Sequence, residues 1–310
     1  MDEHGAVAYD SAGRHLIGFT RAGQQLSEKW KKELAPGQLL DVTCFGRCPR
    51  VALLIQDPAA PAGSRVEFAD EQGRAVDTWA SEANEPGLPL RVFRWRPESA
   101  LFLRNRAAAV ELVARHDGKE IVLRLRTSAA IVKTDPAGDS VVIIDDGRAS
   151  VISTRPGGAW NLVRQFPTTA TAACIAASGD RVLIAGDEDV VVEVPSGRLH
   201  RTASTLTHAG ACALAGDWTV TGSLGTVNGA PRSEWVARQS GSQSLWRSSY
   251  RQLGDVFMAP SGGTACIAFA QPVCRTARGA ELTGITGSVV QDAAGQIVYL
   301  ADDGSLRQVS

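Results

Sequence analysis

Short runs of apolar and β-branched residues alternate with clusters of turn-forming residues along most of the chain. The segment Thr171–Ala203 shows the pattern best, because Ser178-Gly179-Asp180, Gly186–Asp189 and Pro195-Ser196-Gly197 divide it into four such runs. Apolar runs bounded by Gly, Pro, Asp and Ser are typical of β-strands joined by tight turns. The segment therefore predicts four consecutive strands.

The same four-strand pattern recurs at a spacing of roughly 40 residues, which is the length of one blade of a β-propeller. Six complete units cover residues 38–80, 89–127, 129–167, 170–205, 208–250 and 254–285. Residues 286–310 supply an incomplete unit, and residues 5–20 supply a hairpin that would complete it as a seventh blade. A closed ring leaves no blade face uncovered. We therefore expect an all-β fold, a seven-bladed propeller of four-stranded antiparallel blades. Its N- and C-terminal strands would pair, the termini would lie side by side, and residues 1–310 would form one domain.

One segment departs from this pattern. Between Gln24 and Leu34 the apolar residues Leu26, Trp30 and Leu34 recur every four residues, which predicts one face of a short helix. Its lysines indicate a solvated surface, with a basic patch beside a membrane as the alternative.

Charge and hydrophobicity narrow the classes of partner. The net charge is −1, so no overall basic field favours nucleic-acid binding. A hydrophobic fraction of 44% allows a sizeable core, while no apolar run is long enough to predict a membrane-spanning segment. If the protein is exported, we expect its signal peptide or membrane anchor to lie upstream of this sequence.

The chain has six cysteines, an even number, and their spacing is compatible with disulfide bonds. They are Cys44, Cys48, Cys174, Cys212, Cys266 and Cys274. Cys44 and Cys48 flank a short turn, and Cys266 and Cys274 bracket a tight connection between neighbouring strands, so we expect a disulfide in each pair. Alignment of the units places Cys174 and Cys212 at one position on adjacent innermost strands, where a bond is one possibility and separation the other. The alternative is that all six cysteines are reduced and buried as small hydrophobic residues. Disulfides would indicate an extracytoplasmic protein, secreted or membrane-anchored.

Several predicted hairpins resemble the repeat of the quinoprotein-like (PQQ-repeat-like) propellers. The segments AYDSAGRHLIGF, FADEQGRAVDTW and YLADDGSLRQV carry the resemblance, although the spacing from Gly73 to Trp79 is longer than in that repeat. WD40 propellers are a poorer match, since neither a Gly-His nor a Trp-Asp pair closes the blades. The resemblance implies a propeller that binds other proteins, and it carries no reaction with it.

Motifs of catalysis are missing from the sequence. It holds no nucleophile elbow, zinc-protease, phosphate-loop or EF-hand motif, and no Asp box of the sialidase type. The histidines are scattered; they are His4, His15, His116, His200 and His208. Acid clusters such as Asp145-Asp146, Asp187–Asp189 and Asp302-Asp303 fall mainly in predicted turns. We accordingly predict no catalytic residue, metal or cofactor, although residues converging from several blades would escape a search for motifs.

The lengths of the connections point to one face of the propeller. Turns between first and second and between third and fourth strands are short, whereas the long insertions join second to third strands or successive blades. Binding residues tend to lie on loops held by a rigid scaffold. The candidate contacts are Asp57, Glu82, Asn84, Glu85, Asn228 and Arg232. These loops serving only as spacers is the alternative.

These observations favour a non-catalytic extracytoplasmic propeller that binds a protein partner, whose identity the sequence does not give, through its long-loop face. The alternative is a propeller enzyme, a lyase, hydrolase or quinoprotein-type dehydrogenase, with its site at the mouth of the central channel.

Overall fold

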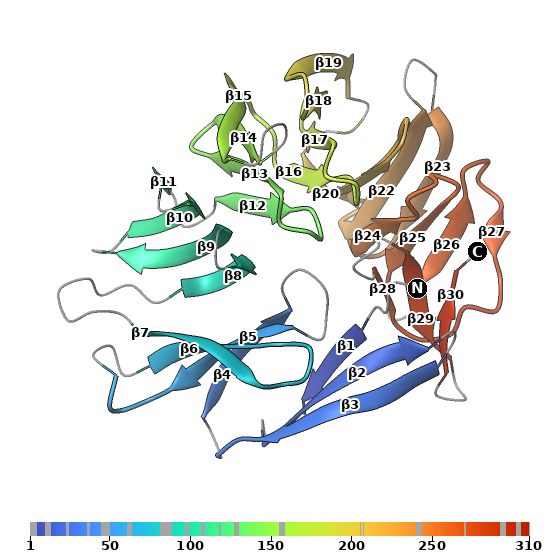
Figure 1. Cartoon of the computed structure of the whole chain (residues 1–310). Helices are drawn as coiled ribbons and strands as arrows, with labels where there is room; N and C mark the ends of the chain where they lie inside the picture. Colours follow the sequence, from blue (N-terminus) through green and yellow to red (C-terminus); the bar gives the residue numbers. More distant parts are fainter. Residues whose placement is uncertain are drawn as a thin grey trace. The chain divides into compact units, whose positions relative to one another are not determined.

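The computed structural model of the chain contains thirty strands in eight antiparallel sheets within its described residues (Figure 1). The structure describes all residues except 1–4, 10–13, 23–24, 36–37, 45–49, 61–63, 81–88, 97–98, 107–108, 118, 127–129, 155–158, 205, 207, 240–243, 270, 292–295, 302–304 and 310. In this part of the chain, no helix is both long and apolar enough to span a membrane.

The chain divides into two compact units. Unit 1 comprises Met1–Ser128 and Pro136–Gly138, and unit 2 comprises Ala129–Asp135 and Asp139–Ser310. The expectation of one domain over residues 1–310 stays a prediction.

Unit 1 holds three sheets, each ordered as in the sequence or its reverse. The first is three-stranded and consists of β1 (Gly5–Tyr9), β2 (His15–Ala22) and β3 (Gln25–Glu33). The second consists of β4 (Leu39–Cys44), β5 (Val51–Gln56), β6 (Ser64–Ala69) and β7 (Ala75–Ala80). The third consists of β8 (Pro89–Arg96), β9 (Ser99–Arg106), β10 (Ala109–His116) and β11 (Lys119–Arg124).

Unit 2 holds five sheets. The first two consist of β12 (Ile131–Thr134), β13 (Ser140–Asp145), β14 (Arg148–Ser153) and β15 (Asn161–Pro167), then β16 (Ala172–Ile175), β17 (Arg181–Ala185), β18 (Glu188–Glu193) and β19 (Arg198–Ala203). The next consists of β20 (Ala209–Ala215), β21 (Trp218–Val227), β22 (Ala230–Gln239) and β23 (Ser244–Tyr250). The last two consist of β24 (Asp255–Met258), β25 (Thr264–Ala268), β26 (Val273–Thr276) and β27 (Glu281–Leu282), then β28 (Val289–Gln291), β29 (Ile297–Leu300) and β30 (Leu306–Gln308).

The expected number of blades is wrong: the described residues form eight sheets, not seven. The terminal strands were expected to complete one blade, but they lie in two separate three-stranded sheets, β1-β2-β3 and β28-β29-β30. The reason is β3, which pairs with β2 along the register from His15↔Glu33 to Ala22↔Gln25 and so gives the N-terminal hairpin a third strand from its own sequence. The expectation that the termini lie side by side stays a prediction.

The expected helix between Gln24 and Leu34 is also wrong, because this segment forms β3. A spacing of four residues fits one face of a helix, but it is also two repeats of a strand. Trp30 and Leu34 are buried, whereas the intervening Lys31 and Glu33 are exposed. Tertiary packing selects the strand, because the Trp30 indole occupies the space that the missing side chain of Gly73 leaves. A Cβ on Gly73 would lie 2.7 Å from a ring carbon of Trp30.

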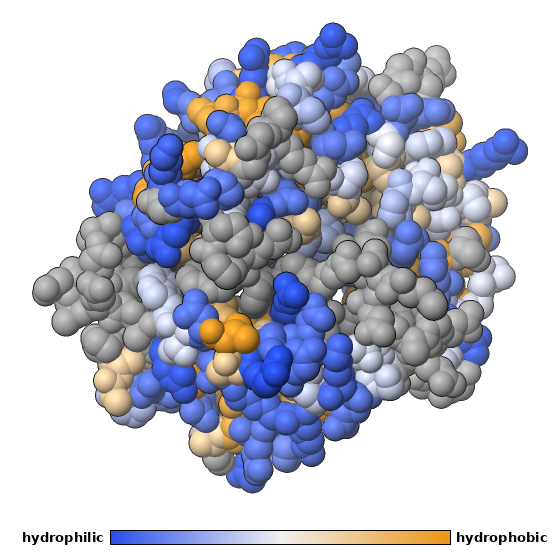
Figure 2. Space-filling view, viewed as in Figure 1, coloured by the Kyte–Doolittle hydropathy of each residue, from blue (hydrophilic) through white to orange (hydrophobic). Residues whose placement is uncertain are grey.

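The apolar faces of neighbouring sheets pack against each other within each unit. In unit 2, Val142 and Val151 join Val182, Ile184 and Val190 of the next sheet in one buried cluster. In unit 1, Phe68 and Phe102 from the second and third sheets share another. On the face shown in Figure 2, hydrophilic residues predominate and hydrophobic ones form scattered patches. Burial of sheet faces between neighbours is how blades are stabilised in a propeller.

A buried ion pair links two neighbouring sheets of unit 2. The Arg238 Nη1 atom on β22 lies 3.5 Å from the Asp189 Oδ2 atom on β18, and both side chains are buried. Arg238 also donates a hydrogen bond of 3.1 Å to the Ala203 carbonyl oxygen. Burial raises the pKa of Asp189, against the lowering effects of the Arg238 charge and of a hydrogen bond from Ser204.

Trp235 is the largest fully buried side chain among the described residues, so we expect the packing of unit 2 to depend strongly on it. We expect Trp235→Ala to lower the free energy of unfolding by about 3–5 kcal/mol, because the side chain leaves a large cavity. A Cβ on Gly222 would lie 2.6 Å from the indole, so Gly222→Ala should cost about 1–3 kcal/mol. Urea denaturation measures both losses, with the exposed Val290→Ala as the control. A loss below about 1 kcal/mol for Trp235→Ala would contradict this packing.

The Asp189–Arg238 pair predicts a pH dependence of stability. Because burial raises the pKa of Asp189 in the folded protein, the contribution of this group is fully present below its ordinary pKa of 3.8 and is lost as the pH rises through the folded value. Arg238→Met removes the charge that lowers this pKa, so the pKa rises further. We expect a loss of about 3–5 kcal/mol near pH 7 that is smaller when measured near the ordinary pKa of 3.8.

Arg201→Met is the matched control for this experiment, since the Arg201–Glu188 ion pair is exposed on the same sheet. Its loss should be below about 1 kcal/mol. Equal losses for the two variants at both pH values would show that the Asp189–Arg238 pair has no special role.

Candidate functional site

Strands β21 and β22 form a hairpin that extends past the rest of its sheet. Strand β20 pairs with β21 only as far as Ser223, and β23 pairs with β22 only from Ser233 onward. Between these points, the pairs of residues 224–232 belong only to the β21–β22 ladder, from Leu224↔Ser233 to Val227↔Ala230. We call residues 224–232 the ribbon.

The turn of the ribbon explains why this segment is a hairpin and not an irregular loop. Asn228 and Gly229 stand between the paired residues Val227 and Ala230, with φ angles of 52° and 76°. Positive φ at both central residues is the mark of a type I′ turn, whose twist matches that of the flanking strands. The dipeptide Asn-Gly was the signal in the sequence that an extended hairpin occupies this insertion.

The base of the ribbon is held by buried polar and apolar contacts. The Trp235 Nε1 atom donates a hydrogen bond of 2.9 Å to the Ser233 hydroxyl, which in turn donates to the Gln252 carbonyl oxygen at 2.5 Å. Ser233 and Trp235 are fully buried. The ribbon therefore starts from an ordered part of the core.

Beyond this base the described side chains of the ribbon are exposed. Leu224 has 53% of its surface exposed. Arg232 follows Pro231 on β22, and Arg251 follows Tyr250, the residue that pairs with Ser233. Both arginines are exposed, and neither has an ion-pair partner among the described residues. The ribbon thus presents an apolar residue and unneutralised positive charge to solvent.

The structure places the sequence-predicted contact residues in different settings. Asn228 and Arg232 both belong to the ribbon. Asp57 follows β5 in unit 1. Its carboxylate accepts one hydrogen bond from the Ala59 backbone N–H at 3.0 Å and lies 3.0 Å from Arg65 Nε, which indicates a turn-forming role. The remaining three, Glu82, Asn84 and Glu85, lie outside the described residues.

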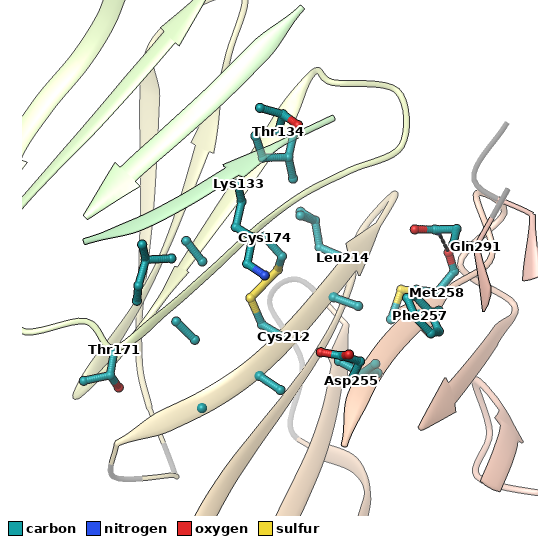
Figure 3. A pocket seen from close by; sticks show the side chains of 18 residues that line it. Lys133, Thr134, Thr171, Cys174, Cys212, Leu214, Asp255, Phe257, Met258 and Gln291 are labelled. Atoms are coloured by element: carbon teal, nitrogen blue, oxygen red, sulfur yellow. Dashed lines mark hydrogen bonds between the residues drawn. A yellow bond between two sulfur atoms is a disulfide. The ribbon is translucent and has the colours of Figure 1, made fainter. Parts of the chain in front are cut away.

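A second feature of unit 2 is a cavity of about 410 Å³ (Figure 3). Residues of the first strand of all five sheets line it, namely β12, β16, β20, β24 and β28. Small side chains predominate, and the two charged residues in the lining are Lys133 and Asp255. Gln291 also lines it, with its amide donating to the Met258 carbonyl oxygen at 2.9 Å. Sequence reasoning did not single out Lys133 or Asp255, because they belong to different sheets and to no motif.

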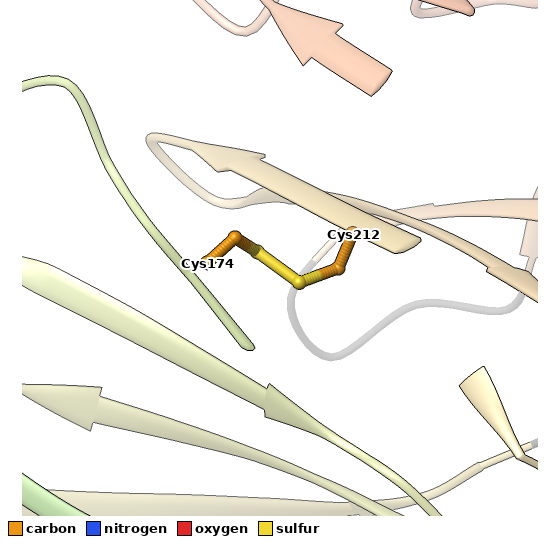
Figure 4. The surroundings of a disulfide bond; sticks show 2 residues. All are labelled: Cys174 and Cys212. Carbon is orange, nitrogen blue, oxygen red and sulfur yellow. A yellow bond between two sulfur atoms is a disulfide. The ribbon is translucent and has the colours of Figure 1, made fainter. Parts of the chain in front are cut away.

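Two disulfides lie in unit 2. Cys174 on β16 and Cys212 on β20 line the cavity and join neighbouring sheets, with their Cα atoms 5.8 Å apart (Figure 4). In Figure 3 the Lys133 side chain points toward this bond. Cys266 and Cys274 face each other across β25 and β26, with Cα atoms 4.0 Å apart. The expected Cys44–Cys48 bond lies outside the described residues.

Two polar groups away from the cavity, the Glu193–His200 pair and Asp146, have structural roles. His200 Nε2 lies 2.9 Å from Glu193 Oε1 on the exposed side of β18 and β19, and this hydrogen bond lowers the pKa of Glu193. Asp146, with φ of 48°, forms a hairpin turn with Gly147. Among the residues that the structure describes, no three His, Cys, Asp or Glu side chains are placed to hold a metal ion.

Comparison with known proteins identifies the fold. No protein-family model and no curated protein sequence matches the chain. Among solved structures, it is similar to Hsv2p of Kluyveromyces lactis, with a TM-score of 0.52, 8% identity, and coverage of 100% of this chain and 98% of that one. It is also similar to the WD40 domain of SCAP from fission yeast, with a TM-score of 0.51, 9% identity and coverage of 99% and 91%. A third similar structure is a functionally unknown protein of Desulfotomaculum acetoxidans, with a TM-score of 0.51, 11% identity, and coverage of 98% of this chain and 98% of that one.

The protein has the β-propeller fold. WD40 domains are propellers with four-stranded blades, and most sheets of this protein also have four strands. At such low identity the likeness is one of fold alone. None of these comparisons points to the quinoprotein-like class, so that narrower resemblance stays a prediction.

The Cys174–Cys212 bond predicts a cooperative effect on stability. It closes a loop with a sequence separation of 38, so its removal should lower the free energy of unfolding by up to about 4 kcal/mol. Cys174→Ala and Cys212→Ala should each cause most of this loss, and the double variant should lose little more. Denaturation of the three variants, with peptide mapping of the unreduced protein, measures the effect. Additive small losses would show that the two sulfurs are not bonded.

Proposed function

We propose that this protein is a non-catalytic, extracytoplasmic propeller that binds a protein partner through the ribbon and the loops on the same side of its sheets. The ribbon is the observation that carries the proposal. Asn228 and Arg232, two of the residues expected from the sequence to contact a partner, belong to it.

The ribbon contributes little to the stability of the fold. A two-stranded hairpin is marginal in water unless further strands or a core support it, and residues 224–232 have no further strand beside them among the described residues. Leu224 remains largely exposed, so it contributes little to the core. An ordered extension with this composition is well suited to contact another protein, where its exposed surface becomes buried.

The two disulfides support the extracytoplasmic part of the proposal, since such bonds form and persist mainly in oxidising compartments. Quenching native cells with acid and an alkylating reagent tests it. We expect Cys174, Cys212, Cys266 and Cys274 to escape alkylation until a reductant is added. Full alkylation of these four before reduction would contradict extracytoplasmic residence.

A shortened hairpin tests the role of the ribbon. Replacing residues 225–232 with Asn-Gly keeps the Leu224↔Ser233 pair and closes it with a two-residue turn. We expect this variant to fold with a similar thermal midpoint but to lose a partner that the unmodified protein captures from its native cell envelope after cross-linking. Leu162→Ala is the matched control, because Leu162 on β15 is 53% exposed, like Leu224. Identical capture by shortened and unmodified protein would exclude the ribbon as the binding element.

A further inference from the structure

The geometry of the ribbon points to the way in which it binds: we propose that the partner supplies an extended acidic segment, which pairs with the outer edge of β21 along Leu224–Val227 as an added strand. This inference rests on the proposed function and specifies the chemistry of the partner. Its grounds are the open backbone of β21, the proline on β22 and the position of Arg232.

The outer edge of β21 is open along the ribbon. The last pair between β20 and β21 is Ala209↔Ser223, so no strand lies beside Leu224–Val227 on that side within the described residues. Among the described backbone hydrogen bonds outside the ladders, none involves these four residues. An open strand edge presents N–H and C=O groups that an extended peptide can pair with.

The two edges of the ribbon differ. On β22 the outer edge contains Pro231, which has no N–H to donate, followed by the charged Arg232. Proline and charge are the features that prevent pairing at an edge strand. On β21 the corresponding residues Leu224–Val227 include neither. Strand addition is therefore disfavoured at β22 and allowed at β21.

Arg232 determines the charge of the segment that fits. It pairs with Gly225, and residues paired across an antiparallel ladder lie on the same face. Gly225 has no side chain, and a Cβ placed there would meet only the Arg232 carbonyl oxygen, at 4.0 Å. The space over Gly225 is thus open toward an added strand. That strand would lie two strand spacings from β22, roughly 10 Å, which an arginine and a glutamate side chain can bridge together.

Two further residues refine the specificity. Arg251, next to the base of the ribbon, adds a second positive charge without an ion-pair partner among the described residues. Leu224 lies on the opposite face of β21 from Gly225, because side chains alternate along a strand. The fitting segment therefore alternates acidic residues, on the face of Gly225, with apolar residues, on the face of Leu224.

A synthetic peptide of alternating valine and glutamate, blocked at both ends and labelled with a fluorophore, tests this directly. Fluorescence anisotropy with the full chain should give a Kd on the order of 100 μM. Hydrogen exchange should show the amides of Leu224–Val227 becoming protected. The peptide can be N-methylated either on all its valines or on all its glutamates, and each of these two isomers has one edge blocked. One of the two isomers should bind at least about tenfold more weakly than the parent peptide. No binding at about 1 mM, or equal binding by both isomers and the parent, would overturn strand addition.

Charge reversal tests the acidic specificity. In the Arg232→Glu/Arg251→Glu variant, the valine–glutamate peptide should bind about tenfold more weakly, and a valine–lysine peptide should bind more tightly than it does to the unmodified protein. Both arginines are exposed, so the variant should fold, which its thermal midpoint checks; Leu162→Ala is again the matched control. Unchanged affinities would overturn the choice of an acidic segment.

The shortened hairpin separates this inference from the proposed function. If residues 225–232 are needed for partner capture but the peptide does not bind, the ribbon is a binding element and strand addition is wrong. If the shortened protein captures the same partners, the proposed function itself fails.

Discussion

The structure depends on the packing of each apolar sheet face against the sheet beside it. The apolar face of a sheet must be buried against another element, and repeat architectures gain stability chiefly from such interfaces. Phe68 and Phe102 in unit 1, and Trp235 with Val256 and Ile267 in unit 2, show this packing. It also explains why strand interiors are rich in aliphatic residues while polar chemistry is confined to turns, edges and a few buried pairs.

The ribbon is the part of unit 2 that this packing does not require. Its strands continue β21 and β22 past the last pairs with β20 and β23, where no neighbouring strand covers them among the described residues. The hydrogen bonds of Ser233 and Trp235 join its base to the core, so the ribbon is held in place without being buried. A rigid base and exposed edges are what recognition by strand addition needs, because little ordering cost remains to be met on binding.

The inner strands of unit 2 serve a different purpose. They surround the cavity with small side chains, and the Cys174–Cys212 bond joins two of them across neighbouring sheets. The Asp189–Arg238 pair makes a second link between the same two sheets, from the third strand of one, β18, to the third strand of the other, β22. A covalent bond and a buried ion pair thus connect the sheet of β16–β19 to the sheet that carries the ribbon.

Local chemistry in the sequence determined the strands, their turns and the antiparallel order within each four-stranded sheet, because Gly, Asn, Asp and Pro set turn geometry among near neighbours. It also brought Cys266 and Cys274 together, since a short turn leaves few alternatives. The tertiary structure decided what depends on distant residues. The four-residue spacing around Trp30 fits a helix or a strand equally, and the space at Gly73 decides for the strand. That strand in turn makes the N-terminal hairpin a sheet of its own. One cavity is lined by Lys133, Asp255 and the Cys174–Cys212 bond. They come together only when five sheets pack, so no local sequence pattern could have predicted the cavity.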